Sequence, residues 1–187
     1  LVNVTDGYYI WSEKYDRDTE DIFKIQDEIS LAIVDKLKVR LQSGEKSRLI
    51  RHNTEDVKAN SLYMRGLFFC NRRTEEDIRK SIDYFKKAIQ RDDSYALAYT
   101  GLADAYIILL DYSNASPKEI FPGAEDAVIK ALEIDDSLAE AHTSMAQILY
   151  RYSWEWEESE REFKRAIELN PNYATAYHWY GLTLMYR

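Results

Sequence analysis

Hydrophobic residues recur at intervals of three or four positions along most of this chain, which places them on one face of an α-helix. From about residue 56 onward the spacing comes in paired segments, and a small residue lies near the centre of each. In the first pair these small residues are Gly66 and Ala88, with large apolar residues such as Leu62 and Phe85 beside them. Because side-chain size sets how closely two helices approach, the pattern predicts antiparallel helix pairs that touch at the small positions.

The paired segments repeat. Residues 87–99, 130–142 and 165–177 align with one another without gaps, and Ala131 lies 43 positions after Ala88 and 35 before Ala166. A helix–turn–helix unit of the tetratricopeptide repeat (TPR) is about 34 residues long, so the second interval is near that length and the first carries an insertion. The large–small–large positions of the two helices, here called A and B, are Leu62, Gly66, Phe69, Ser81, Phe85 and Ala88, then Tyr99, Leu102, Ala103, Tyr106, Ala124, Val128 and Ala131, then His142, Met145, Ala146, Leu149, Ser159, Phe163, Ala166 and Pro171, and finally Tyr177, Tyr180, Gly181 and Leu184.

From about Asp56 to Arg187 these spacings resemble the TPR family. The resemblance implies an all-α solenoid of about three and a half units within residues 54–187. We place the units near 56–92, 95–136 and 138–171, with a half unit at 173–187.

Short polar segments separate the predicted helices. Residues 92–94, 135–137 and 170–172 each end one helix and cap the next, and Pro171 requires the preceding helix to stop near Leu169. Two segments depart from the repeat: residues 71–74 lengthen the first turn, and residues 110–117 form a larger insertion. We expect extra helical turns or a protruding loop at the insertion.

Residues 1 to about 43 do not fit the repeat. Two short apolar runs around a Thr5-Asp6-Gly7 turn predict a β-hairpin. A helix then starts at Asp18-Thr19, and its apolar face is Ile22, Ile25, Ile29, Ile33, Leu37 and Leu41. The fold class predicted from the sequence is therefore an all-α TPR solenoid with a short N-terminal β-hairpin plus helix.

This leading segment resembles the end of a TolB-like domain, in Gly7, Trp11-Ser12-Glu13, Tyr15-Asp16 and residues 21–29. Trp154-Glu155-Trp156, followed by residues 166–174, is also typical of the TPR arrays that follow such domains in bacterial and archaeal signalling proteins. The resemblance implies a larger protein with an upstream cyclase or winged-helix output domain. A plain strand–helix cap on the solenoid is the alternative, and we favour the truncated α/β segment. Because a lone hairpin is marginal in water, we expect its edge to pair with a second copy, giving a homodimer.

Composition narrows the function. The net charge of −8 disfavours binding to nucleic acid or anionic membranes. No apolar run approaches a membrane span, and no signal peptide is visible. The sequence starts without Met and ends inside a helical pattern, so we expect it to be part of a longer protein. The single cysteine, Cys70, fits a reducing compartment, and we expect a cytoplasmic location.

Residues with catalytic or ligating potential are few. The three histidines lie outside metal-ligand spacing of one another and of Cys70, and Cys70 lies in an apolar run typical of an inert buried thiol. His142 occupies a packing position. The acidic run from Glu155 to Glu162 is typical of a solvated helix face. We expect no enzyme activity, no metal and no cofactor. Trp156 is predicted to lie in the core, whereas Trp154 fits either the core or a binding surface.

A partner is expected on the concave face, which the A helices line in stacked repeats. Family resemblance carries groove positions onto Tyr63, Leu67, Thr100, Asp104, Thr143, Gln147, His178 and Leu182, with Asn60 and Arg151 among the residues beside them. The Lys and Asn that clamp a terminal carboxylate in chaperone-binding relatives are absent from Tyr63, Leu67, Thr100 and Asp104, so we expect no binding of acidic chaperone tails. The predicted function is a protein–protein interaction scaffold that binds a protein or peptide. Alternatively, the leading segment senses a ligand or dimerises the protein.

Overall fold

The computed structural model describes residues 22–36 and 53–186. The chain divides into two compact units, one of residues 1–57 and the other of residues 58–187. In the first unit, helix α1 (Ile22–Lys36) holds Ile25, Ile29 and Ile33 half-buried, while Lys24 and Glu28 are exposed. This is the apolar face expected of the leading helix. Leu37 and Leu41 lie outside the described residues.

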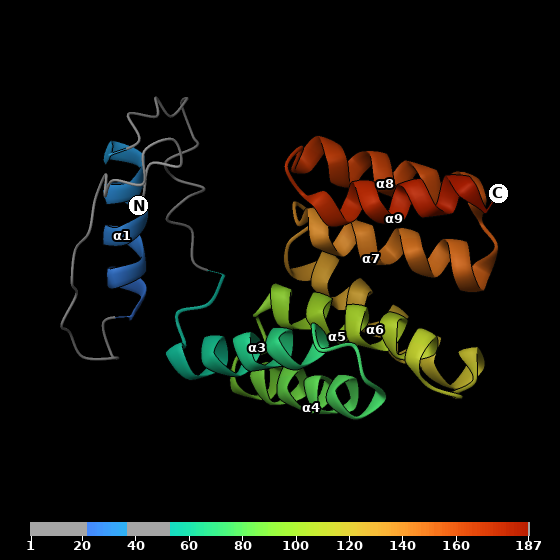
Figure 1. Ribbon diagram of the computed structural model, residues 1–187, viewed down its shortest axis with the longest axis horizontal. Helices are drawn as coiled ribbons and strands as arrows, with labels where there is room; N and C mark the ends of the chain where they lie inside the picture. The colour runs from blue at the N-terminus through green and yellow to red at the C-terminus, as the bar shows by residue number, and fades with distance from the viewer. Residues whose placement is uncertain (1–21, 37–52, 187) are drawn as a thin grey trace, which may run out of the picture. The chain divides into compact units, whose positions relative to one another are not determined.

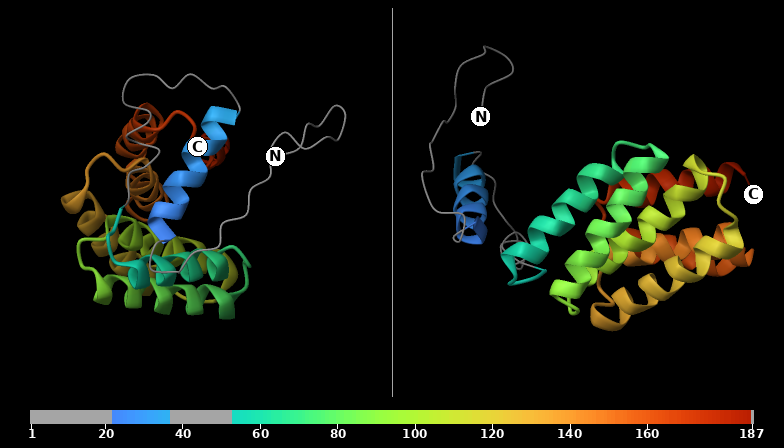
Figure 2. Two further views of the ribbon diagram at one scale, coloured as in Figure 1. Left: turned by 90° about the vertical axis from the view of Figure 1, so that its left-hand side faces the viewer. Right: turned by 90° about the horizontal axis from the view of Figure 1, so that it is seen from below.

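The second unit is a succession of helix pairs (Figure 1). Its helices are α3 (Val57–Cys70), α4 (Glu75–Arg91), α5 (Ala96–Tyr112), α6 (Pro117–Ile134), α7 (Ala139–Ile148), the short π-helix η2 (Leu149–Ser153), α8 (Trp156–Leu169) and α9 (Ala174–Met185). Each of α5, α6, α7 and α8 packs against the next helix in the chain, and α5 also contacts α7, which in turn contacts α9. The A helices α5, α7 and α9 are thus neighbours, as in a helical solenoid (Figure 2).

Small residues create the closest helix contacts. The fully buried ring of Phe85 on α4 lies against Gly66 of α3 and Gly101 of α5. A Cβ atom added at Gly66 would lie 2.5 Å from Cε1 of Phe85, and one added at Gly101 would lie 2.6 Å from the same atom. Ala103 and Ala146, the equivalent small positions of the next units, are 0% exposed. All three small positions of the repeat thus lie in buried helix contacts, as the pattern predicts.

The turns between pairs share one hydrogen-bond pattern. Asp92 accepts hydrogen bonds from the backbone N–H and the hydroxyl of Ser94, and Asp135 does the same for Ser137. Asn170 accepts one from the backbone N–H of Asn172, and α8 ends at Leu169. These side chains satisfy backbone groups that the helix ends leave unpaired.

The larger insertion is helical at both ends, with a short non-helical link at residues 113–116. It extends α5 to Tyr112 and starts α6 at Pro117, where Ser116 and Glu119 form a reciprocal capping box. The π-helix η2 follows α7 directly and is capped by Trp154, whose φ of 62° is left-handed. The repeat pattern gave no indication of η2.

The predicted fold class is wrong in one respect. The described residues, 22–36 and 53–186, are helical with turns and contain no strand, so the fold is all-helical without a β-hairpin element. Residues 1–11, on which the hairpin prediction falls, lie outside the described residues. The physical reason is that a two-stranded hairpin needs a third strand or a covering helix to be stable, and the described part offers no strand as a partner.

Candidate functional site

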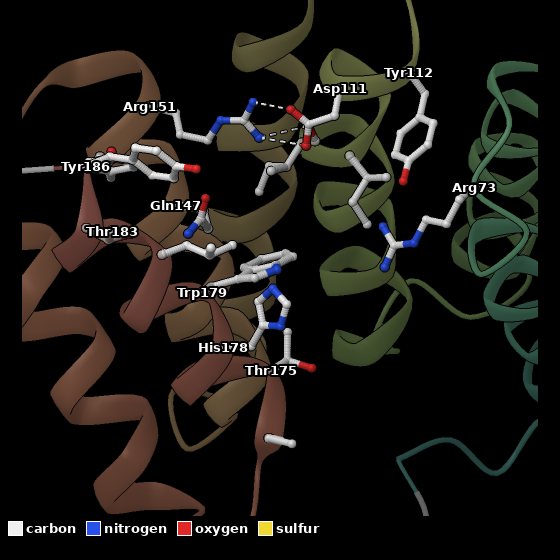
Figure 3. Close-up of a pocket in the computed structure, with 15 residues that line it drawn as sticks. Arg73, Asp111, Tyr112, Gln147, Arg151, Thr175, His178, Trp179, Thr183 and Tyr186 are labelled. Atoms are coloured by element: carbon white, nitrogen blue, oxygen red, sulfur yellow. Dashed lines mark hydrogen bonds and ion pairs between the residues drawn. The ribbon is translucent and has the colours of Figure 1, made fainter.

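A hollow of about 720 Å³ opens between the C-terminal half of α5, the α7–η2 junction and α9. Its walls mix aliphatic side chains such as Ile108 and Leu182 with aromatic ones such as Trp179 and Tyr186. Arg73, from the loop between α3 and α4, reaches the same hollow (Figure 3). The A helices that form it are the neighbours expected to line a concave face.

An ion pair spans one side of the hollow. Arg151 of η2 donates to both carboxylate oxygens of Asp111 on α5, with Nη2 2.5 Å from Oδ1 and Nη1 3.2 Å from Oδ2. Nη1 also lies 3.5 Å from the carbonyl oxygen of Ile107. Because a bidentate pair fixes both distance and orientation, it ties η2 to the extended end of α5 (Figure 3).

One buried polar group beside the hollow lacks a partner. Thr183 of α9 is 5% exposed, and its hydroxyl has no hydrogen-bond partner within the described part of the chain. An unsatisfied buried hydroxyl is costly, so it favours a ligand or water that supplies the missing bond. His178 is exposed on the wall that α9 forms.

A second polar group lies along the same row of A helices. The Ser144 hydroxyl on α7 lies 2.5 Å from Oδ1 of Asp104 on α5. Burial, together with the charge of Glu140, raises the pKa of Asp104 to about 7, although the bond to Ser144 and the charge of Arg73 act in the opposite direction. The carboxyl group therefore changes charge near neutral pH.

Apart from Asp104, which bonds to Ser144, the predicted groove residues fall into three groups. Gln147, Arg151, His178 and Leu182 line the hollow. Asn60, Tyr63 and Leu67 lie on α3, where Asn60 accepts a hydrogen bond from the hydroxyl of Tyr95 and Tyr63 packs against Phe85 and Tyr95. Thr100 and Thr143 are buried, and their hydroxyls donate to the carbonyl oxygens of Ala96 and Ala139.

Sequence reasoning missed Arg73, Asp111, Trp179 and Thr183. Arg73 and Asp111 come from the two segments that depart from the repeat, so family positions could not be carried onto them. Trp179 and Thr183 each follow a predicted position by one residue, because the hollow curves around α9. At 3.6 residues per turn, Trp179 lies roughly 80° and Thr183 roughly 120° around α9 from the midpoint of His178 and Leu182, so a helical wheel centred there would have reached Trp179 at its margin and missed Thr183.

Other candidate chemistry is modest. Cys70 is buried, and desolvation raises the pKa of its thiol to about 11, which leaves it protonated and unreactive. Residues 22–36 and 53–186 contain no group of three or more His, Cys, Asp or Glu side chains arranged to hold a metal ion. None of the helices in those ranges has the length and apolar character needed to cross a membrane.

His142 does more than fill space. Its Nδ1 lies 2.5 Å from Oε2 of Glu162 on α8, and its Nε2 lies 2.9 Å from the carbonyl oxygen of Asp136. Burial lowers the pKa of His142, but the bonds to Glu162 and Asp136 outweigh it and raise the pKa above its usual value. Both ring nitrogens face acceptors, so the ring is positioned as an imidazolium that joins α7 to α8.

Comparison with solved structures gives the fold. The TPR domain of Arabidopsis OM64 superposes with a TM-score of 0.55 at 19% identity, covering 73% of this chain and 100% of that one. The first TPR of Spaghetti (RPAP3), bound to the HSP90 peptide SRMEEVD, superposes with a TM-score of 0.52 at 21% identity, covering 68% of this chain and 91% of that one. The chain has a TPR-like helical repeat fold. No protein-family model matches the sequence.

Two curated proteins are similar in sequence. A Rhizobium meliloti protein named "Putative adenylate cyclase 3" is 32% identical over 161 residues, which cover 82% of this chain and 26% of that protein. Superkiller protein 3 of Schizosaccharomyces pombe is 28% identical over 114 residues, which cover 61% of this chain and 8% of that protein. The chain thus spans about a quarter or less of these relatives.

Proposed function

We propose that this chain is a protein–protein interaction scaffold that binds a peptide segment of a partner in the hollow between α5, α7 and α9. The open hollow between neighbouring A helices, with His178 and Leu182 exposed on its α9 wall, is the observation that carries this proposal. A peptide segment presents both apolar side chains and a regular row of backbone carbonyl and N–H groups, which match the mixed walls of the hollow.

The walls of the hollow suit a peptide better than a small molecule. Leu182 is 40% exposed and Trp179 is half-buried, so apolar side chains of a partner gain contact area on α9. Gln147 and the Arg151–Asp111 pair lie on the opposite wall and supply donors and acceptors. Mixed apolar and polar walls of this kind are typical of surfaces that bind extended or helical segments.

The wider context is also a proposal. The likeness to a protein named as an adenylate cyclase supports a regulatory or adaptor region of a larger signalling protein. From the resemblance of the sequence itself, we infer that this region comprises a TolB-like segment at 1–43 and the repeat array at 54–187. We infer that this region itself catalyses no reaction and acts in the cytoplasm, where the free thiol of Cys70 would stay reduced. We do not carry forward dimerisation through a β-edge, because the described part contains no strand.

Site-directed photo-crosslinking tests the groove. A benzoylphenylalanine probe replaces Leu182 in the hollow or, as a matched control, Ile129 on α6. Their side chains are 40% and 43% exposed, and Ile129 does not line the hollow. In lysate of the native organism, we expect a discrete crosslinked partner with the probe at position 182 and none with the probe at 129. Equal labelling from both positions would contradict a groove-specific partner.

Calorimetry with an acidic chaperone tail tests whether peptides of that kind belong to the partners of this chain. Thr100 and Thr143 lie at central groove positions and are buried, and no lysine lines the hollow. We therefore expect no detectable heat with the peptide SRMEEVD, the ligand in the RPAP3 structure. Micromolar binding of that peptide would show that the chain uses a carboxylate clamp built from other residues, such as Arg73.

A further inference from the structure

The corner between η2 and α8 exposes aromatic surface that the packing of the repeat leaves uncovered. Trp154 is 68% exposed, whereas Trp156 at the first position of α8 is half-buried. The prediction that Trp156 lies in the core therefore holds only in part, and Trp154 belongs to the surface. Large exposed indoles are unusual outside binding sites.

The rings at this corner support one another. Tyr150 packs edge-on against Trp156 with ring centroids 5.1 Å apart and an interplanar angle of 80°. Trp154 and Trp156 lie 5.9 Å apart at 59°, so their two faces form an angled notch. A hollow of about 490 Å³ lies there, lined by residues 154–158 alone, and it shares no lining residue with the groove.

Two of the three carboxylates that line this hollow have no ion-pair partner among the described residues, whereas the third, Glu158, pairs with Arg161. Glu155 and Glu157 are exposed and have no ion-pair partner among the residues that the structure describes. Other helical carboxylates, such as Glu75 with Arg79 and Glu160 with Lys164, are paired one turn away. Favourable interaction with the helix dipole accounts for acidic residues in the first turn of α8, but it does not account for an indole exposed between them.

We propose that the notch of Trp154, Trp156, Glu155 and Glu157 binds an arginine side chain of a partner protein. A guanidinium stacks on an indole face and is attracted by its π-electrons, while its N–H groups pair with carboxylates in the same plane. Arginine fits better than a metal ion, since the described residues hold no cluster of metal-ligating side chains. This notch is separate from the groove, so the proposal for it can be tested independently of the proposed peptide site.

Indole N–H signals in ¹⁵N NMR spectra of the full chain provide the test. The chain has four tryptophans, so the signals can be assigned with single Trp→Phe variants. The probes are acetyl-Gly-Arg-Gly-amide and the same peptide with citrulline, which keeps the shape of arginine but lacks its charge. We expect saturable shifts of the Trp154 and Trp156 signals with the arginine peptide alone, and no shift of Trp179 in the groove. The absence of saturable shifts, or equal shifts with citrulline, would overturn the proposal.

Two variants separate binding from folding. Trp154→Gly removes the ring and places at φ 62° the residue that adopts this backbone most readily, so the fold should be retained. Glu157→Gln removes one unpaired carboxylate, and Glu133→Gln on α6 is the matched control. We expect the arginine peptide to bind Trp154→Gly and Glu157→Gln about two- to fivefold more weakly, as loss of an exposed cation–π or charge contact implies. Parent-like affinity in Trp154→Gly would refute the site.

Discussion

The first helix pair and the last helix place the same residue type in opposite surroundings. Gly66 on α3 lies against the buried ring of Phe85, whereas Gly181, at the equivalent repeat position on α9, has nothing within 4 Å of the place where a Cβ would lie. Both glycines are part of one sequence pattern. The difference shows that the small position matters energetically only where a B-type helix fills the space beside it.

Neighbouring residues show the same contrast. On α9, Tyr177 and Leu184 are 48% and 51% exposed. Their equivalents on α7 and η2, His142 and Leu149, are half-buried, and His142 is bonded to α8. On α7 the small residue Ala146 also brings the backbones together, because the Ser159 hydroxyl of α8 donates to its carbonyl oxygen at 2.8 Å. The face of α9 that holds Tyr177, Gly181 and Leu184 thus has the pattern of a helix contact without the contact itself.

Removing the ring of Phe85, which fills the space beside Gly66, should have the largest effect on the stability of the fold. Phe85→Ala leaves a cavity between α3, α4 and α5, and we expect it to lower the free energy of unfolding by about 3–5 kcal/mol. Urea denaturation followed by circular dichroism measures the change. A loss below about 1 kcal/mol would mean that the ring is not the centre of this contact.

Adding a methyl group at Gly66, where the Phe85 ring fills the space, should have the second-largest effect on stability. In Gly66→Ala the new Cβ meets a ring that is held between two helices and cannot move aside. Overpacking costs about 1–3 kcal/mol, and the better helix propensity of Ala offsets about 1 kcal/mol of it. We expect a net loss of up to about 2 kcal/mol in the same urea experiment. A gain in stability would contradict the close approach of α3 and α4.

The His142 bond to α8 should make stability depend on pH. Because the folded-state pKa of His142 is raised above the ordinary value of about 6.5, the bond stabilises the fold fully below that pH and is lost as pH rises through the folded pKa. Asp104 also lowers stability as pH rises from about 4 through its folded pKa of about 7, so a His142 variant is needed to separate the two contributions.

Stability measured across neutral pH in the parent and the variant tests this dependence. We expect His142→Gln to remove about 1 kcal/mol of the fall in stability, the usual contribution of one hydrogen bond, and to leave the part due to Asp104. His178→Gln, on the exposed side of α9, is the matched histidine control. An identical fall in the parent and in His142→Gln would assign the dependence to another group.

A change at Gly181, on the open face of α9, should have the smallest effect, and it should be a gain in stability. Gly181→Ala adds a methyl group in open space on a helix, so only helix propensity changes, and we expect a gain of up to about 1 kcal/mol. Thermal melting of the parent and the variant side by side is sufficient to measure it. A clear loss of stability would mean that another element occupies this face in solution.

Much of the helical array could be predicted because its physics is local and repeated. Ala88, Ala131 and Ala166 recur with the same neighbours, and the structure buries all three at 0% exposure. Gly101 was overlooked, because it lies two positions before the repeat's own small residue, and its role depends on the neighbouring unit's Phe85. The π-helix η2 was also missed, since no residue type marks a change from α- to π-hydrogen bonding.

The hollow was harder to predict than the helices. Gln147 and His178 were found because the family's groove positions could be carried along the repeat. Arg73 and Asp111 could not be found this way, because they come from segments whose course the repeat does not fix. The ten predicted groove residues remain a prediction as a set, and crosslinking from the hollow is the experiment that bears on them.

A double-mutant cycle tests the central claim about packing most directly. Phe85→Leu shortens the side chain that Gly66 faces, so it should relieve the cost of Gly66→Ala. We expect the two changes to be coupled by more than about 1 kcal/mol, whereas Gly181→Ala and Phe85→Leu should add within about 0.5 kcal/mol. Additive costs for Gly66→Ala and Phe85→Leu would contradict the claim that small residues let the helices close around the ring.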